Sequence, residues 1–140
     1  MIINNFRMKN LYSKEPISLM EDISLKVFSF ICKNALNKYM PELLNKKLYA
    51  DLVNKEEFLS IKESIGELQM INLSILHSYS QNAVLSFWLN AFNFLTIFTI
   101  IYKKEILMNN YEWYRFLKSS TYNIGGLEFS LYEIEYCILK

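Results

Sequence analysis

The pattern of apolar and polar positions predicts a chain built mainly of helices. Apolar residues recur at steps of three and four along residues 17–40 and again along residues 54–71, the spacing of a helix with one buried face. Pro16 is expected to open the first helix, because a first turn leaves its N–H position unpaired anyway, and Pro41 ends that helix. Asn54 is expected to be the N-cap of the second helix.

A segment free of Asp, Glu, Lys and Arg runs from Leu68 to Tyr102, and its part from Ala83 to Tyr102 is long enough to span a bilayer as a helix. On a helix its polar residues fall within an arc of roughly 120°. This stripe consists of Asn82, Ser86, Asn90, Asn93 and Thr96. A polar stripe favours a core helix of a soluble domain, whereas the length and the Lys pair that follows favour a membrane span.

Three shorter elements complete the chain. "NYEWYRFLKSS" predicts an aromatic helix, and "NIGGLEF" predicts two extended pieces around a turn at Gly125–Gly126. In "SLYE", Ser130 and Glu133 form a capping box, which starts the last helix at Leu131. The predicted fold class is therefore mainly α (α+β). It is a helical bundle around one long uncharged buried helix, with a small β-hairpin before a C-terminal helix.

Composition narrows the classes of function. With 52% hydrophobic residues the chain can build a substantial core, and a net charge of +1 gives no basic excess for nucleic-acid binding. The strong preference for Lys over Arg is typical of an AT-rich coding genome and is not read as a binding patch. Two cysteines without metal-site spacing and the lack of a signal peptide indicate the cytoplasm.

Two stretches resemble the signatures of the family called domain of unknown function 547. "FWLNAFNFLTI", Phe87 to Ile97, resembles "F-W-[IL]-N-[AV]-Y-N-A-L", and "YNIGGLEFSLYEIEYCILK", Tyr122 to Lys140, is similar to the second signature. "ELQMINLSIL", Glu67 to Leu76, resembles the step before them, and residues 17–33 are similar to a helix upstream of the domain in plant members. The resemblance implies an intracellular α+β module of unsettled activity, found in eukaryotes and bacteria. Some members are joined to a glutaredoxin, a signalling domain or a leucine-zipper segment.

The departures from the family pattern bear on chemistry. Members commonly have His or Lys where Phe98 stands and His where Tyr136 stands, and they continue into a Cys-containing segment, "C-x-x-S-C-P-P". The resemblance therefore implies that residues 16–140 form a single, C-terminally truncated domain. Residues 1–15 are expected to be a loosely packed lead-in.

The residues that carry the signatures are expected to be structural: Trp88, Asn90, Asn93, Gly125, Gly126, Ser130 and Glu135. In particular, Asn90 and Asn93 are expected to bond buried backbone such as the "NIGG" segment. Cys32, Cys137 and His77, the single His, are more often packing residues than nucleophiles, bases or ligands. No catalytic residue is assigned, and neither a metal site nor a cofactor is predicted.

The sequence therefore predicts a non-catalytic interaction or scaffold module with a protein partner. One alternative is part of a thiol or glutaredoxin-linked redox enzyme that needs the Cys-containing segment. The second alternative is a membrane-anchored helical protein that uses Ala83 to Tyr102. Nucleic acid is not expected as a partner.

Overall fold

The computed structural model describes residues 2–4, 14–34, 46–104 and 107–139, with the backbone alone for residues 46–48. The described part is mainly α-helical with a small hairpin before the last helix, which confirms the predicted fold class. In chain order the elements are α1 (Pro16–Asn34), α2 (Lys46–Leu52), α3 (Glu56–Gly66), the 3-10 helices η2 (Glu67–Met70) and η3 (Leu73–Ser78), α4 (Gln81–Lys103), α5 (Asn110–Ser119), β1 (Thr121–Ile124), β2 (Leu127–Ser130), α6 (Leu131–Glu133) and the π-helix η4 (Ile134–Ile138).

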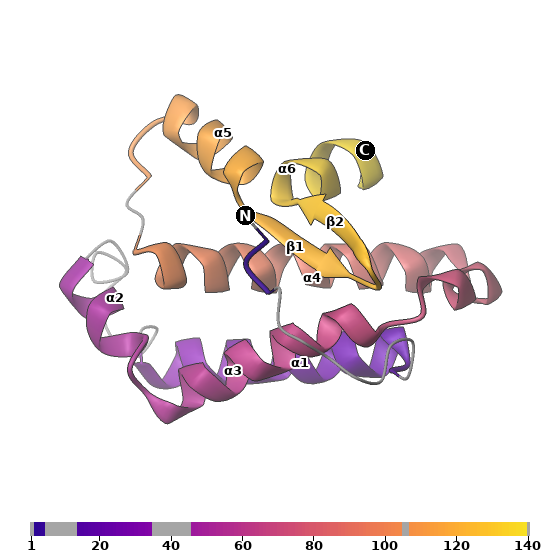
Figure 1. Ribbon diagram of the computed structural model, residues 1–140, viewed down its shortest axis with the longest axis horizontal. Helices are drawn as coiled ribbons and strands as arrows, with labels where there is room; N and C mark the ends of the chain where they lie inside the picture. Colours follow the sequence, from indigo (N-terminus) through magenta and orange to yellow (C-terminus); the bar gives the residue numbers. More distant parts are fainter. Residues whose placement is uncertain (1, 5–13, 35–45, 105–106, 140) are drawn as a thin grey trace.

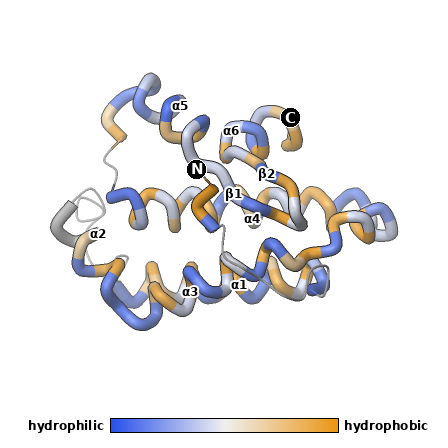
Figure 2. Tube along the Cα trace, in the orientation of Figure 1, coloured by the Kyte–Doolittle hydropathy of each residue, from blue (hydrophilic) through white to orange (hydrophobic). Residues whose placement is uncertain are grey.

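Helix α4 lies between two layers (Figure 1). The pair α1 and α3 covers one side, and the hairpin with α5 and α6 lies on the other. Figure 2 shows hydrophobic and hydrophilic residues interleaved along α1, α3 and α4, as expected for helices with one face in a core. Phe58 of α3 stacks on Phe98 of α4 at a centroid distance of 5.0 Å and lies 5.8 Å from Phe30 of α1. These rings join the three helices.

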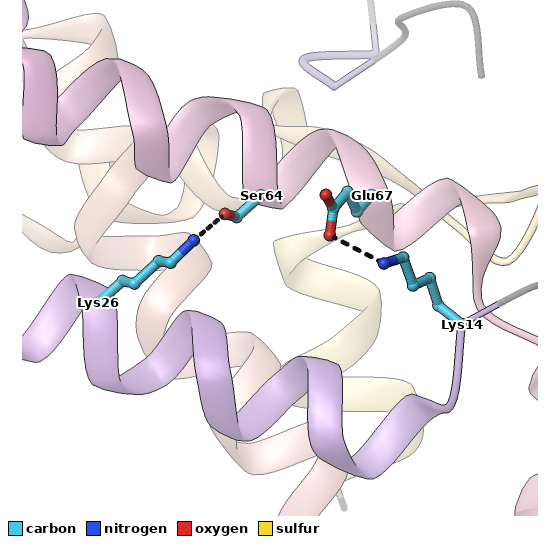
Figure 3. A network of polar contacts seen from close by, with 4 residues as sticks. All are labelled: Lys14, Lys26, Ser64 and Glu67. Carbon is cyan, nitrogen blue, oxygen red and sulfur yellow. Dashed lines mark hydrogen bonds and ion pairs between the residues drawn. The ribbon is translucent and has the colours of Figure 1, made fainter.

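Polar contacts also join α1 to α3 (Figure 3). The Lys26 ammonium donates a hydrogen bond of 2.7 Å to the buried Ser64 hydroxyl. Lys14, just before α1, and Glu67, at the start of η2 directly after α3, form an ion pair of 3.9 Å. Because an exposed ion pair contributes at most about 1 kcal/mol, the apolar contacts hold the helices together and the polar links help to fix their register.

Pro16 is the first residue of α1, as predicted, and Glu15 caps that helix. Its carboxylate accepts hydrogen bonds from the N–H groups of Ile17 and Ser18 at 3.0 and 2.7 Å and from the Tyr79 hydroxyl. Burial opposes the charge of Glu15, but these hydrogen bonds outweigh it and lower the pKa of Glu15 to about 2. The capping carboxylate thus also ties α1 to the residue that follows η3.

The predicted N-cap of α3 is wrong. Lys55 occupies the cap position without a side-chain cap, and the amide of Asn54 instead donates to the carbonyl of Ala50 at 3.1 Å. Asn54 is used to close the end of α2, because the chain makes a tight turn between α2 and α3. The predicted end of the first helix near Pro41 lies outside the described residues.

Residues 2–4 pack along the hairpin instead of forming a loosely packed lead-in. Ile2 pairs in parallel with Thr121, and the N–H of Ile3 donates to the Thr121 carbonyl at 2.9 Å. The Asn4 side chain is 1% exposed and bonds both the N–H and the C=O of Asn123. Residues 1 and 5–13 of the predicted lead-in lie outside the described part.

The predicted turn at Gly125–Gly126 joins β1 and β2, and both glycines have positive φ, 63° and 92°. Gly125 is also held against η2 and η3. Its N–H donates to the Leu68 carbonyl at 2.8 Å, and a Cβ there would lie 2.6 Å from Leu73 Cγ and 2.9 Å from the carbonyl oxygen of Ile71. Glycine is therefore required at 125 by the turn and by the close approach.

The predicted capping box at Ser130 is confirmed. The Ser130 hydroxyl accepts from the N–H of Glu133, and the Glu133 carboxylate accepts from the N–H of Ser130, both at 3.0 Å. After one turn the helix widens into the π-helix η4. Single-turn π segments are rare and are enriched at functional sites, which directs attention to the contact between η4 and α4.

Candidate functional site

The signature residues lie on α4, on the hairpin and on η4, which packs on α4. Trp88 is almost fully buried, with its ring edge-on to Phe87 at 4.9 Å and 5.2 Å from Phe129 of β2. Aromatic contacts of this kind fix the relative position of two elements. Trp88 therefore joins α4 to the hairpin.

Asn90 and Asn93 lie on the outer side of α4. Asn90 is half-buried, Asn93 is exposed, and neither side chain hydrogen-bonds to any residue that the structure describes. This differs from the expectation that both amides bond buried hairpin backbone. The reason is that Asn4 fills that role from the N-terminal end of the chain.

The outer side of α4 carries a row of residues at four-residue steps, which we call the α4 row: Leu85, Leu89, Asn93 and Ile97. Its three aliphatic side chains are 51%, 46% and 38% exposed, respectively. Steps of four drift by only about 40° around a helix, so the row forms one continuous oblique stripe. It contains no charge, and its four residues are exposed, as are Gln81, Asn82 and Ser86 near the start of the same helix.

Among the described helices, α4 alone is long and apolar enough to cross a membrane, as judged by length and composition. Half of its most apolar window is buried inside the fold. A core helix of a soluble domain passes the same test, so this finding does not decide between a core helix and a membrane span.

Two buried side-chain oxygens, one on α4 and one on η4, have unused hydrogen-bonding capacity. Within the described chain, neither Thr96 Oγ1 on α4 nor Glu135 Oε2 on η4 has a partner. A buried polar atom without a partner costs about 1–3 kcal/mol, so such atoms are few in native proteins. The family signature points to Glu135, whereas the sequence marks Thr96 only as a member of the polar stripe.

The two cysteines and the histidine are carried by three different elements. Cys32 is half-buried on α1, Cys137 is exposed on η4, and both are unpaired. His77 is exposed on η3. In the ranges that the structure covers, no three His, Cys, Asp or Glu side chains gather closely enough to hold a metal ion.

The two positions at which the family resemblance implied His have different surroundings. Phe98 is buried and stacks between Phe58 and Tyr102 at centroid distances of 5.0 and 5.5 Å. Tyr136 is 39% exposed, and its ring lies 4.7 Å from that of Tyr132. Phe98 is therefore a core residue, whereas Tyr136 belongs to a surface.

That surface was missed by the sequence reasoning. The Lys118 ammonium lies 4.4 Å from the ring centroid of Tyr114 on α5 and 4.8 Å from that of Tyr132 on α6. The two tyrosine rings meet edge to face at 5.4 Å, and a hydrogen bond with Tyr114 raises the pKa of Lys118. The four-residue spacing of Tyr114 and Lys118 was the available signal, but the contact with Tyr132 depends on the fold.

A shallow depression lies beside the hairpin turn. Asn72, Leu73, Ser74, Gly125 and Leu127 line it, and none of these carries a charge. It is a consequence of the close approach of Gly125 to η3. The hydroxyl of Ser74 donates to the amide oxygen of Asn72 at 2.6 Å, and none of the described residues that line the depression is an acid or base that could activate that hydroxyl.

Residues 76–140 match the model of the family described as "Protein of unknown function, DUF547". The part of the chain from the end of η3 onward is consistent with a DUF547 domain, which confirms the family resemblance there. The similarity of residues 17–33 to plant members lies upstream of the match and stays a prediction. Neither a curated protein nor a solved structure matches the chain.

Proposed function

We propose that this chain is a non-catalytic interaction module that binds a helix of a protein partner on the α4 row. The observation that carries the proposal is the exposure of Leu85, Leu89 and Ile97 in one uncharged stripe. Full burial of one such side chain is worth about 1.5–3 kcal/mol, so an occupant that covers three of them gains a useful part of a binding free energy.

The shape and polarity of the row support a helix as the occupant. A continuous apolar stripe along a helix is complementary to the apolar face of an amphipathic helix that crosses it at an angle, and helix binding of this kind is a recurrent mode of peptide recognition. Asn93 and the half-buried Asn90 add amide donors and acceptors at the centre of the stripe. These amides favour a partner with polar groups at matching positions and so support specificity.

The free cysteines support a cytoplasmic location for the module.

A second candidate, an enzyme of thiol or glutaredoxin-linked redox type, is favoured by one observation. The carboxylate of Glu135 has a buried oxygen without a partner in the described chain, on a π-helix that also carries Cys137. Thiol chemistry needs a base within hydrogen-bond reach of the sulfur. No hydrogen bond between Cys137 and His77 or another base is present in the described chain, so this candidate needs residues supplied by the Cys-containing segment of the family or by a partner.

Photo-crosslinking tests the proposed function. Leu89 is replaced by benzoylphenylalanine, and the chain is expressed in the cells from which it comes. The expected result is a discrete crosslinked product with one protein, and the product disappears when Leu85→Glu is introduced beside the probe. The control probe is placed at Lys55, an exposed residue on the α3 side of the molecule.

Three outcomes would contradict the proposal. Equal products from positions 89 and 55 would show non-specific contact, and no product from position 89 would leave the row without an occupant. Crosslinks to lipid from position 89 would assign α4 to a membrane, as in the second alternative.

A further inference from the structure

We infer that the outer face of α5, α6 and the adjoining η4 binds an acidic segment of the partner protein. This face, which we call the tyrosine–cation surface, consists of Tyr111, Tyr114, Arg115, Lys118, Tyr132 and Tyr136. The inference rests on the proposed role of the chain as an interaction module, and it concerns a different face from the α4 row.

The surface is assembled by the amphipathic pattern of α5. On a helix Tyr111, Tyr114, Arg115 and Lys118 fall within an arc of about 100°. Phe116 and Leu117 point the other way and are buried. The arc is open to solvent, with Tyr111 68% and Tyr114 43% exposed. Exposed aromatic side chains beside Arg are the composition of binding hot spots rather than of an ordinary solvated face.

Contacts between the rings hold the surface in one arrangement before a partner arrives. Tyr132 touches both Tyr114 and Tyr136, with centroid distances of 5.4 and 4.7 Å, so α5 and the last helix present their rings together. The Lys118 ammonium lies over the rings of Tyr114 and Tyr132. The guanidinium of Arg115 lies 5.9 Å from the ring centroid of Tyr111. A prearranged surface loses little conformational entropy on binding.

The charges on this face are of one sign. Within the described residues neither Arg115 nor Lys118 pairs with a carboxylate. The nearby carboxylates have other hydrogen-bond partners: Glu112 accepts from the N–H of Met108, just before α5, and Glu133 accepts from the N–H of Ser130. The complementary occupant is therefore a segment that brings carboxylates to the cations and apolar groups to the rings.

Fluorescence anisotropy with a fluorescein-labelled oligoglutamate peptide tests the inference. The full chain is compared with the double variant Arg115→Gln/Lys118→Gln and with the matched double variant Lys33→Gln/Lys55→Gln, which loses the same charge on the α1 and α3 side. We expect the first variant to bind about tenfold or more weakly and the second to stay within about twofold of the parent. Lys118→Arg is expected to keep binding, because the charge over the rings is retained.

The salt dependence gives a second readout, since binding through exposed charges weakens as ionic strength rises. Equal loss in both double variants, or no binding of oligoglutamate by the parent chain, would overturn the inference. Binding of phosphatidylserine vesicles through Arg115 and Lys118 without binding of oligoglutamate would overturn it as well, because the surface would then recognise a membrane. If the chain still crosslinks through position 89 in any of these cases, this inference is overturned and the proposed function stands.

Discussion

Asn4 and Asn123 are 119 residues apart in the sequence, yet the side chain of one is hydrogen-bonded to both backbone groups of the other. The Asn4 amide donates to the Asn123 carbonyl at 2.8 Å, and its carbonyl oxygen accepts from the Asn123 N–H at 2.6 Å. The amide thus pairs with β1 as a neighbouring strand would. It also donates to the carbonyl of Ile65 at 3.0 Å, so one buried side chain joins the N-terminal end, the hairpin and the end of α3.

Replacement of Asn4 by Leu is therefore expected to be costly. One buried and two partly buried backbone groups would lose this partner, and we expect the free energy of unfolding to fall by about 2–3 kcal/mol. Urea denaturation followed by circular dichroism measures the change. Asn54→Leu is the control, because that amide makes one exposed bond, and a loss below about 0.5 kcal/mol is expected there. Similar losses at both positions would show that burial of Asn4 is not the source of the effect.

Gly125→Ala should destabilise the hairpin more than Gly126→Ala. Both residues have positive φ, which an L-residue adopts with strain, but alanine at 125 would also meet Leu73 and the Ile71 carbonyl. Gly126 is exposed. We expect Gly125→Ala to cost about 2 kcal/mol or more and Gly126→Ala about 1 kcal/mol, measured by thermal melts. Equal costs would place the strain in the turn alone.

Glu15 should give the fold a dependence on acidic pH. Its pKa is lowered in the folded chain from 4.5 to about 2, so its contribution is fully present above about pH 4.5 and is lost as the pH falls towards 2. The expected result is that Glu15→Gln melts below the parent chain at neutral pH and that the two melting temperatures converge near pH 2. Tyr79→Phe should show a smaller version of the same behaviour. A gap that stays constant across this range would contradict the role of the carboxylate.

Cys137 should be accessible but ordinary in reactivity. It is exposed, and within the described residues its thiol makes no hydrogen bond or ion pair that would activate it. Iodoacetamide labelling of the folded chain, followed by mass spectrometry, should proceed at the rate of a cysteine in a short peptide. The half-buried Cys32 should react more slowly. Fast labelling of Cys137 at about pH 6 that disappears on denaturation would instead identify an activated thiolate and favour the enzyme candidate.

The features that the sequence predicted correctly depend on local signals. Pro16 opens α1, the two glycines make the turn, and the Ser130 capping box starts the last helix. Each of these is decided by steric or hydrogen-bonding properties of residues within a few positions. The uncharged run also predicted one long helix, because its length exceeds that of a strand.

The features that were missed depend on contacts between distant segments. The bonds of Asn4 to β1 have no local signal, and their omission led to the incorrect assignment of that role to Asn90 and Asn93. Lys118 meets Tyr132 only after the hairpin has turned the chain back towards α5. Which side of α4 stays uncovered is likewise set by how two layers pack on it, and apolar periodicity cannot identify it when nearly every position is apolar.

The central claim is that the α4 row is open in the isolated chain and covered by a protein partner in the cell. Thiol footprinting of Leu89→Cys, in a chain that also carries Cys32→Ser and Cys137→Ser, tests it most directly, with Lys55→Cys as the control site. In the purified chain both engineered thiols should react rapidly with a water-soluble reagent. Addition of protein extract from the source cells should slow the reaction at position 89 and leave position 55 unchanged. Slow reaction at position 89 in the purified chain, or the same rate with and without extract, would contradict the account.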